Sequence, residues 1–330
     1  MMKRLLAASL LGAMGLIVAG GCQSGGGSSS TASGGDSGKK IKIGVSVPAA
    51  DHGWTAGVIW WAKEAMALHP DIEWQFQTAD TPQTQISQIE TMMAGGLDGL
   101  VVLATESAPL TPVAEKVRER GIYLVNVDRG FLKPVADVFI EGDNKAFGRK
   151  SAEFIVNKLG GQGKIIVLEG IPSTVNTDRV NAANAVFKAN PGIQVLDSQS
   201  GMWNRQKAFE VTQALLVKHP QVDAIWASDD DMALGAEQAL KEAGRSNVWI
   251  LGGAGMKDIV KRVMDRDPLY PADITYPPSM IATGIQIAAS TLRGGNREKA
   301  APFMPKHMMI DVELITPENA KDYYFEKSIF

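Results

Sequence analysis

The sequence predicts an α/β fold with more strands than one doubly wound sheet comfortably holds. From residue 41 onward, short runs rich in β-branched residues alternate with longer amphipathic segments. This alternation is typical of parallel strands joined by crossover helices. The number of such units indicates two halves built to one plan. The predicted strands are residues 41–47, 73–79, 99–103, 122–127, 164–169, 193–198, 224–227 and 248–251.

The same helix end recurs in both halves of the chain. Residues 68–70 (Leu-His-Pro), 189–191 (Ala-Asn-Pro) and 218–220 (Lys-His-Pro) each close an amphipathic segment just before an apolar strand. Proline cannot continue a helix, and the residue before it is pushed toward extended geometry. We therefore interpret His69 and His219 as helix-terminal residues and not as ligand contacts.

The first residues have the pattern of an export signal. Lys3 and Arg4 give a charged start, residues 5–18 form a short apolar run, and the small residues 19–21 follow. The apolar run is too short to span a bilayer. Residues 1–21 are therefore predicted to be a signal peptide, which places the mature protein in the periplasm or cell envelope.

Cys22 is the only cysteine in the sequence and stands directly after those small residues. This arrangement resembles the lipobox of bacterial lipoproteins, in which the thiol is diacylated, although Ala19 stands where leucine is usual. Ordinary signal cleavage, with Cys22 lost or left as a free thiol, is the alternative. Residues 22–40, rich in glycine and serine, suit a flexible tether that holds the folded part near a membrane through the lipid anchor.

Composition and motifs argue against several classes of function. The chain has 330 residues, a formal net charge of -3 and no basic stripe, so we expect no nucleic-acid partner. Residues 252–255 (Gly-Gly-Ala-Gly) lack the spacing of a dinucleotide-binding loop, and residues 163–165 (Gly-Lys-Ile) lack the hydroxyl residue of a phosphate-binding loop. One cysteine and four histidines supply neither a zinc cluster nor an activated nucleophile. We expect no catalytic residue, no metal and no cofactor.

Side chains suited to ligand binding follow the predicted strands. In open α/β sheets, ligands bind beyond the carboxyl ends of the strands. These positions carry carboxylates, a guanidinium group and aromatic rings, which give a polyhydroxylated ligand its hydrogen-bond partners and stacking surfaces. Asp128 and Arg129 could alternatively just pair with each other. The candidates are His52, Trp54, Asp128, Arg129, Trp203, Asp229 and Tyr276.

Some of the neighbouring residues have a structural interpretation. Residues 229–231 (Asp-Asp-Asp) stand where a helix begins, and aspartate at a helix start usually caps it. We expect Asp229 either to cap the helix or to contact ligand, and the two aspartates after it to act as caps. Trp60 and Trp61 lie in the middle of a predicted helix and are expected in the core or in an interface.

Three stretches carry a resemblance to a known family. They are residues 126–129 (Asn-Val-Asp-Arg), residues 139–148 with their Gly-Asp-Asn, and residues 215–235, which read LLVKHPQVDAIWASDDDMALG. With them, the chain from Ile41 onward resembles the periplasmic ribose-binding protein family of ABC importers, which has the type I periplasmic-binding fold. Any one stretch is a weak signal, whereas the three together are specific.

The resemblance implies two Rossmann-like lobes, joined by a three-segment hinge, with the ligand in the cleft between them. The first lobe would comprise residues 41–142 and 276–309, and the second residues 143–275 and 310–330. The hinge would lie near residues 142–144, 274–276 and 309–311. Position by position, the resemblance implies ligand contacts at His52, Trp54, Asp128, Arg129, Trp203, Asp229 and Tyr276, with Arg179 and Asn176 as candidates for a further contact from a helix.

Three positions depart from the pattern of the family. Asp229 stands where sugar binders commonly have asparagine, and Tyr276 stands where ribose binders have glutamine. Residues 252–255 replace a Gly-Phe-Asp-Gly-like turn, so an aromatic and a carboxylate contact are missing. We therefore expect a ligand other than ribose, namely a bulkier sugar, a polyol or a ligand with a positive charge next to Asp229.

The sequence thus predicts a monomeric solute-binding lipoprotein that delivers a sugar or polyol to an ABC permease in the inner membrane by hinge closure. A binding protein that signals to a membrane receptor kinase or chemoreceptor is the alternative, because it would use the same fold and site. A hydrolase on this scaffold would need Asp128 and Asp229 as acid and base, but no residue is marked as a nucleophile.

Overall fold

The computed structural model describes residues 40–293 and 303–330. The predicted signal peptide, Cys22 and all but the last residue of the predicted tether lie outside these residues. The described chain is α/β, with parallel sheets and helices, as predicted.

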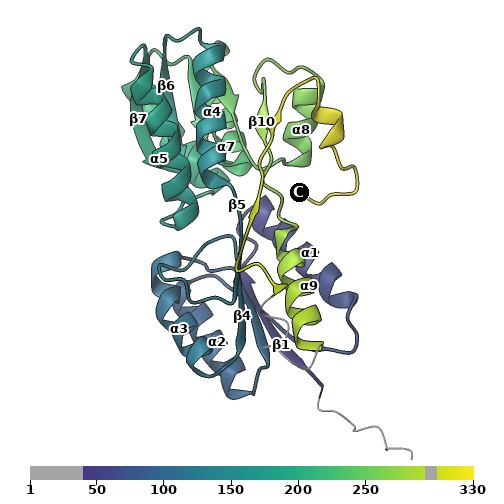
Figure 1. Ribbon diagram of the computed structural model, residues 1–330. Coiled ribbons are helices and arrows are strands. Elements are labelled where there is room, and N and C mark those ends of the chain that lie inside the picture. Colours follow the sequence, from purple (N-terminus) through teal and green to yellow (C-terminus); the bar gives the residue numbers. More distant parts are fainter. Residues whose placement is uncertain (1–39, 294–302) are drawn as a thin grey trace, which may run out of the picture. The chain divides into compact units, whose positions relative to one another are not determined.

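A six-stranded parallel sheet forms the centre of the first lobe, in the order β11-β5-β4-β3-β1-β2. Helices α2 and α3 cover one face, and α1 and α9 cover the other (Figure 1). The bounds are β1 Lys42–Pro48, β2 Glu73–Ala79, β3 Gly99–Val102, β4 Tyr123–Val127, β5 Val138–Gly142, β11 His307–Ile310, α1 Gly53–Ala67, α2 Pro82–Ala94, α3 Ser107–Glu119 and α9 Met280–Arg293.

Burial on both faces explains why β1, β3 and β4, in the middle of this sheet, are almost continuously apolar. In β3, Leu100 and Val102 join the apolar cluster beneath α2 and α3, whereas Val101 joins the cluster on the opposite face. Successive side chains of a strand point to opposite faces, so a sheet covered by helices on both sides needs apolar residues at every position.

The second lobe contains a four-stranded parallel sheet in the order β7-β6-β8-β9. A short antiparallel pair, β10 with β12, lies beside α8 (Figure 1). The bounds are β6 Gly163–Glu169, β7 Ile193–Ser200, β8 Ala224–Ala227, β9 Trp249–Leu251, β10 Asp273–Ile274, β12 Leu314–Ile315, α4 Asn144–Lys158, α5 Thr174–Ala189, α6 Arg205–Lys218, α7 Asp230–Glu242, α8 Lys257–Met264 and a 3₁₀ turn at Ala320–Asp322.

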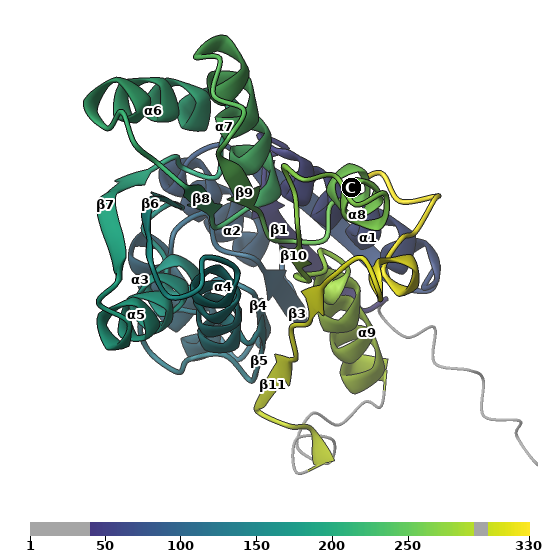
Figure 2. The same cartoon turned by 90° about the horizontal axis from the view of Figure 1, so that it is seen from above.

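The chain passes between the two sheets three times: after β5, after β10 and after β11. Before the last crossing, β11 lies beside β5, although the two strands are far apart in the sequence (Figure 2). Three crossings were predicted, and they fall near the predicted hinge segments. The lobe boundaries at residues 142, 275 and 309 stay a prediction.

The predicted strands are confirmed in type and to within two residues at each end, but four strands were missed. Strand β5 alternates buried and half-buried residues and contains Glu141, so it lacks a continuous apolar run. Strand β11 lies at the sheet edge with two exposed residues, and β10 and β12 have two residues each. Their pairing depends on contacts between distant parts of the chain, which local patterns do not show.

The predicted helix ends are confirmed. Helices α1, α5 and α6 end at residues 67, 189 and 218, just before the three His-Pro or Asn-Pro sequences. His69 Nε2 lies 2.9 Å from Gln286 Oε1, and His219 Nε2 lies 3.2 Å from Asp197 Oδ2. Both histidines therefore have protein partners at helix ends.

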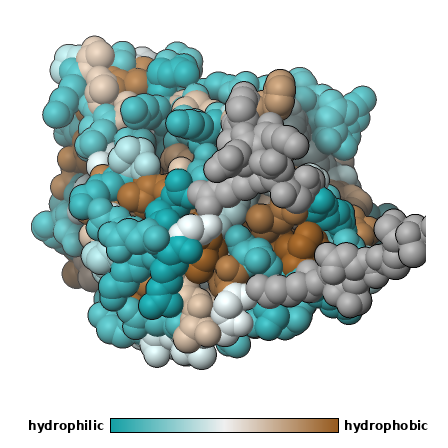
Figure 3. Space-filling model, turned by 60° about the horizontal axis from the view of Figure 1, so that its bottom comes forward, coloured by the Kyte–Doolittle hydropathy of each residue, from teal (hydrophilic) through white to brown (hydrophobic). Residues whose placement is uncertain are grey.

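Hydrophilic side chains cover most of the face shown in Figure 3, with apolar residues visible between them. In the part of the chain that the structure describes, none of the helices is both long enough and apolar enough to cross a membrane.

Helices α4 and α5 pack at a close approach that only glycine permits at residue 148. A Cβ atom on Gly148 would lie 2.0 Å from the backbone oxygen of Arg179. We expect Gly148→Ala to lower the free energy of unfolding by about 1–3 kcal/mol, because the two helices must move apart. Urea unfolding measures this loss.

Gly95→Ala is the matched control, because Gly95 has a helical φ of -73° and its added Cβ would lie 3.3 Å from the nearest oxygen. Its stability should stay within about 0.5 kcal/mol of the parent protein. Equal stability of the two variants would show that the contact between α4 and α5 is looser than described.

Candidate functional site

A cavity with an empty volume of about 280 Å³ lies where residues of both lobes converge. Its walls come mostly from strand exits and helix starts, as expected for ligand sites of open α/β sheets. Eight of the nine residues predicted to contact ligand line it. The lining residues are His52, Trp54, Asp128, Arg129, Val175, Arg179, Trp203, Asp229, Ala254 and Tyr276.

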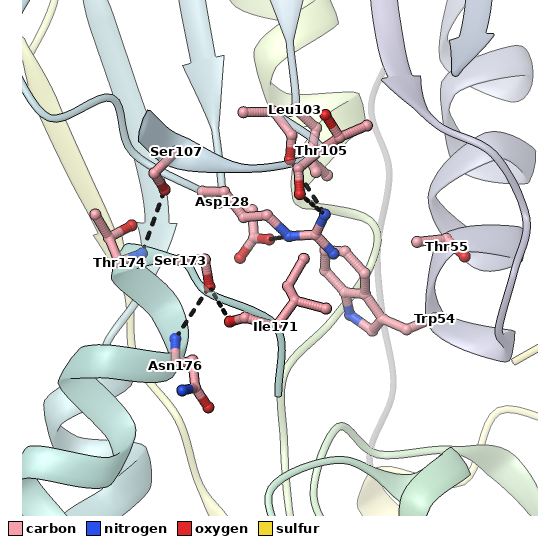
Figure 4. Close-up of polar contacts among 12 residues, drawn as sticks. Trp54, Thr55, Leu103, Thr105, Ser107, Asp128, Ile171, Ser173, Thr174 and Asn176 are labelled. Carbon is pink, nitrogen blue, oxygen red and sulfur yellow. Dashed lines mark hydrogen bonds and ion pairs between the residues drawn. The ribbon is translucent and has the colours of Figure 1, made fainter. Parts of the chain in front are cut away.

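Asn176 is the exception: it does not line the cavity, and its contact with ligand stays a prediction. It lies in the first turn of α5, where its backbone N–H donates to the N-cap hydroxyl of Ser173 over 3.2 Å (Figure 4). Its side-chain oxygen accepts a hydrogen bond from the N–H of Gly170 at 2.7 Å. Asn176 therefore ties the end of β6 to α5, whereas Val175 and Arg179 of the same helix reach the cavity.

Asp128 and Arg129 leave β4 through a turn that fixes both side chains. Asp128 has φ 65°, in the left-handed region, which is uncommon for a residue other than glycine and is frequent at functional sites. Asn126 holds this turn, because its side-chain nitrogen donates to the backbone oxygens of Arg129 and Val102 over 3.1 and 3.2 Å.

The Arg129 guanidinium is buried but keeps an unused donor. Its NH1 group donates to the backbone oxygens of Ala104 and Thr105, at 3.1 and 2.9 Å. Its Nε lies 3.7 Å from a carboxylate oxygen of Asp128 and has no hydrogen-bond partner. Such a buried free donor favours an acceptor on a bound molecule.

Tyr276 connects the two lobes at the base of the cavity. Its hydroxyl donates to Asp128 Oδ1 at 2.5 Å and accepts from the side-chain nitrogen of Asn144 at 3.1 Å. Its backbone oxygen accepts from Trp54 Nε1 at 2.9 Å. The rings of Trp54 and Tyr276 lie with their centroids 5.9 Å apart, so together they form an aromatic wall.

Arg179 continues this network into the second lobe. Its Nε donates to Asn144 Oδ1 at 2.9 Å, and NH1 donates to the backbone oxygen of Ser228 at 2.6 Å. The guanidinium carbon lies 4.3 Å from the Tyr276 ring centroid and 3.8 Å from that of Phe147. These contacts hold Arg179 in one place although it is almost fully buried.

Trp203 lies in a strained turn, and its ring packs against the Arg129 guanidinium. Met202 and Trp203 have φ values of 58° and 51°, two successive residues in the left-handed region. The Arg129 guanidinium carbon lies 5.0 Å from the Trp203 ring centroid. A Cβ on Gly170 would lie 2.1 Å from that ring, so the glycine lets it lie against the chain. Trp203 Nε1 is buried and has no partner.

The three successive aspartates at the start of α7 have different roles. Asp229 lines the cavity and also caps the helix, since it accepts from the Met232 N–H at 2.9 Å. The two residues expected as caps do not act as caps of α7. Asp230 accepts from the N–H groups of Gly253 and Met256, and Asp231 accepts from the N–H of Gly53.

A buried pair of carboxyl groups supports the turn that carries Ala254 into the cavity. Asp230 accepts from Gly253 and Met256, each at 2.8 Å, and Asp273 accepts from the Gly255 N–H at 3.2 Å. The two carboxyl groups also hydrogen-bond each other. Ala254 is held at φ 148°, a conformation that residues with a side chain rarely adopt.

Burial shifts the charge balance of the cavity. It raises the pKa of Asp128 and raises that of Asp229 to about 7. It lowers the pKa of both Arg129 and Arg179. The wall therefore combines two guanidinium groups with two carboxyl groups whose protonated form is favoured by burial. In residues 40–293 and 303–330, no three His, Cys, Asp or Glu side chains are grouped to hold a metal ion.

Sequence reasoning missed four residues around the cavity. Asn126 binds backbone groups of the turn after β4, and Asn144 binds the side chains of Tyr276 and Arg179, so neither residue had a sequence pattern that indicated a role at the site. Val175 is apolar and lies in a helix, which gives it no signal of ligand binding. Ala254 follows β9, so the strand-exit rule could have marked its position, although its side chain offers no polar group.

The comparisons with known proteins identify the class. Over residues 43–296 the chain matches the family described as the periplasmic binding protein domain, and it belongs to this family. The predicted resemblance to ribose binders is confirmed. Members of the family are substrate-binding proteins, among them the ribose import binding protein of Bacillus subtilis, and membership implies an extracytoplasmic location.

Three proteins illustrate the similarity. The D-ribose/D-allose-binding protein of Pseudomonas aeruginosa is 31% identical over 65% of this chain and 69% of its own length. A solute-binding protein of an ABC transporter from Mycobacterium smegmatis, solved with bound glycerol, is 27% identical with TM-score 0.80, over 88% of this chain and 99% of that one. The fructose-binding periplasmic domain of a hybrid two-component system is 26% identical with TM-score 0.78, over 86% of this chain and 93% of that one.

The buried carboxyl pair predicts a pH dependence of stability. Burial raises the pKa of Asp230 to about 7 and that of Asp273 well above its usual value. A carboxyl group with a raised pKa in the folded state stabilises the fold below its unfolded pKa, near 4, and loses this contribution as the pH rises through the folded pKa. The free energy of unfolding should therefore fall from pH 4 to pH 7.

Asp273→Asn should make this fall smaller, because one carboxyl group is gone and the amide can still donate to Asp230. Urea unfolding at several pH values from 4 to 8 measures the difference. Asp258→Asn, at an exposed aspartate of the same lobe, is the control. Parallel curves for the parent protein and Asp273→Asn would contradict the shared role of the pair.

Proposed function

We propose that this protein captures a neutral sugar or polyol outside the cytoplasm and delivers it to an ABC permease by closing its two lobes around the ligand. The observation that carries this proposal is the cavity with aromatic walls and two guanidinium and two carboxyl groups, contributed by both lobes.

The chemistry of the cavity suits a polyhydroxylated molecule. Hydroxyl groups both donate and accept, so they can pair with the Asp128 and Asp229 carboxyl groups and with the free Nε donor of Arg129. The rings of Trp54 and Trp203 can pack against C–H faces of a sugar. The two carboxyl groups would repel an anion when ionised, whereas the hydroxyl groups of a neutral ligand can pair with them in either protonation state.

Closure supplies the signal that a permease would recognise. A ligand that contacts both lobes stabilises the closed form by its difference in affinity between closed and open states. We place the hinge near residues 142–144, 274–276 and 309–311, and the lobe boundaries at residues 142, 275 and 309. Ribose is not the expected ligand, because Tyr276 and Ala254 give this end of the cavity a different outline.

The residues of the cavity support binding and not catalysis. The carboxyl groups of Asp128 and Asp229 have structural partners, Tyr276 and the start of α7. A hydrolase would need one of them free as a nucleophile or base. We therefore assign no catalytic role to either.

Sensing is the second candidate function. The similarity to the fructose-binding domain of a two-component system favours it, because that protein uses the same fold in signal transduction. A permease gene beside the gene for this protein would support transport, and a receptor kinase gene there would support sensing.

Panels of sugars and polyols test the proposed ligand class. A thermal-shift screen of pentoses, hexoses, polyols and amino sugars should give at least one neutral compound that raises Tm, because a ligand stabilises the folded state in proportion to RT ln(1 + [L]/Kd). Arg129→Ala should then weaken binding of that compound by about 2 kcal/mol or more in calorimetry, since a buried charged donor is lost.

Arg293→Ala is the matched control, because this exposed arginine pairs with Asp71 on the same lobe but away from the cavity. Its affinity should equal that of the parent protein. Unchanged affinity in a folded Arg129→Ala protein would remove the cavity as the binding site, and a panel without any stabilising compound would refute the ligand class.

We also propose that the mature protein is a monomer anchored to the membrane through a lipid on Cys22. Cys22→Ala should move the protein from the membrane fraction to the soluble fraction of the cell envelope, because a diacylated cysteine supplies the anchor. Ser28→Ala, in the glycine- and serine-rich stretch that follows, is the control and should leave it in the membrane fraction. Membrane association of Cys22→Ala would refute lipidation.

A further inference from the structure

Two helices begin where the lobes meet, and each receives a hydrogen-bond partner from the other lobe. Helix α1 of the first lobe begins at Gly53, and helix α5 of the second lobe begins at Thr174. The first N–H groups of a helix have no partner within it, and the helix dipole gives that end a partial positive charge. A hydrogen-bond acceptor from outside the helix therefore stabilises this end of the helix.

The start of α1 is capped by Asp231 of the second lobe. The Gly53 N–H donates to Asp231 Oδ2 at 2.7 Å, and Arg205 NH2 donates to Asp231 Oδ1 at 2.8 Å. Asp231 is 4% exposed, so this contact is shielded from water. Helix α1 has no acidic residue in its own first turn. The carboxylate that suits its N-terminus thus comes from the opposite lobe.

Gly53 allows this close approach. A Cβ atom at residue 53 would lie 2.9 Å from Asp231 Oδ2 and 3.1 Å from the ring of Phe330. Even a methyl group would therefore press against the second lobe. Gly53 also separates His52 and Trp54, which both line the cavity, so the contact with Asp231 fixes the backbone between two cavity residues.

A second contact lies at the start of α5. The Thr174 N–H donates to the hydroxyl of Ser107 at 3.2 Å (Figure 4). The Thr174 hydroxyl accepts from the Gly130 N–H at 3.0 Å. Ser107 and Gly130 belong to the first lobe, at the start of α3 and just after Arg129. The three residues of this second contact do not line the cavity, and neither does Asp231.

We propose that Asp231, with Ser107 and Thr174 at the second contact, forms latches that hold the lobes closed without touching the ligand. This inference rests on the proposed function, because it assigns a role within lobe closure. Each latch needs both lobes in contact, so it stabilises only the closed form. Asp231 is a positioning residue that sets the fraction of closed protein, and through it the apparent affinity for every ligand of the cavity.

Latches and ligand contacts predict different effects on selectivity. The apparent Kd is the intrinsic Kd divided by the fraction of protein in the binding-competent state. Weakening a latch therefore multiplies the Kd of all ligands by the same factor. Removing a ligand contact changes the Kd values of different ligands unequally.

Asp231→Ala should weaken binding of each stabilising sugar or polyol about tenfold, the effect of losing one hydrogen bond to a charged group. The ratio of affinities between any two ligands should stay within about twofold. Asp231→Asn should lose less, since its amide oxygen can still accept from Gly53. Asp258→Ala, at an exposed aspartate in the first turn of α8, is the control. Unchanged affinity, or a changed ratio between ligands, would overturn the proposal.

Gly53→Ala provides a second test that removes no polar group. Its methyl group should displace the Asp231 carboxylate from the Gly53 N–H and reproduce the uniform loss of affinity, while Tm of the ligand-free protein stays close to that of the parent. This variant decides the question if Asp231→Ala does not fold. Tight binding by a folded Gly53→Ala protein would contradict the close contact.

A distance measurement without ligand separates this inference from the proposed function. Spin labels on Ala94→Cys and Ala214→Cys, exposed residues of α2 and α6, can be placed in a Cys22→Ala background, since Cys22 is the only native cysteine. Adding Asp231→Ala should shift the ligand-free distance distribution toward longer distances. An unchanged distribution overturns the latch, whereas a parent protein that binds no compound of the panel overturns the proposed function alone.

Discussion

The Tyr276 hydroxyl is the interaction on which the rest of the site depends. It donates to Asp128 of the first lobe and accepts from Asn144, which in turn accepts from Arg179 of the second lobe. Buried polar groups stabilise a structure only when their partners are complete. Gly142 leaves room for the ring, because a Cβ there would lie 2.2 Å from it. The Tyr276 side chain thus connects the two lobes next to the crossing after β5. It binds Asp128 directly and Arg179 through Asn144.

This network explains how opposite charges are kept in a small cavity. An unpaired buried ion would be strongly destabilising, and a pair is tolerated when hydrogen bonds satisfy the remaining atoms. Arg129 and Arg179 donate to backbone oxygens and also lie near carboxyl groups, so part of each guanidinium is already paired. The few groups left free, Arg129 Nε among them, are the ones that a neutral ligand with hydroxyl groups could satisfy.

Much of this arrangement could be predicted from the sequence, and the failures have physical reasons. The strand-exit rule located Asp128, Arg129 and Tyr276, because parallel strands place their carboxyl ends at one edge. Asn176 does not line the cavity, because the helix turns its side chain toward Gly170, and a shift of one residue along a helix changes the face on which a side chain lies. Asp231 was expected to cap its own helix, and only the contact between lobes shows that it caps α1.

The central claim is that a neutral sugar or polyol binds between the two lobes. Its most direct test is a crystal structure of the protein with the compound that most raises its Tm. We predict that the ligand lies in the cavity, with a hydroxyl oxygen accepting from Arg129 Nε and its C–H face against Trp54 or Trp203. A ligand bound outside this cavity, or contacts with one lobe alone, would contradict the account.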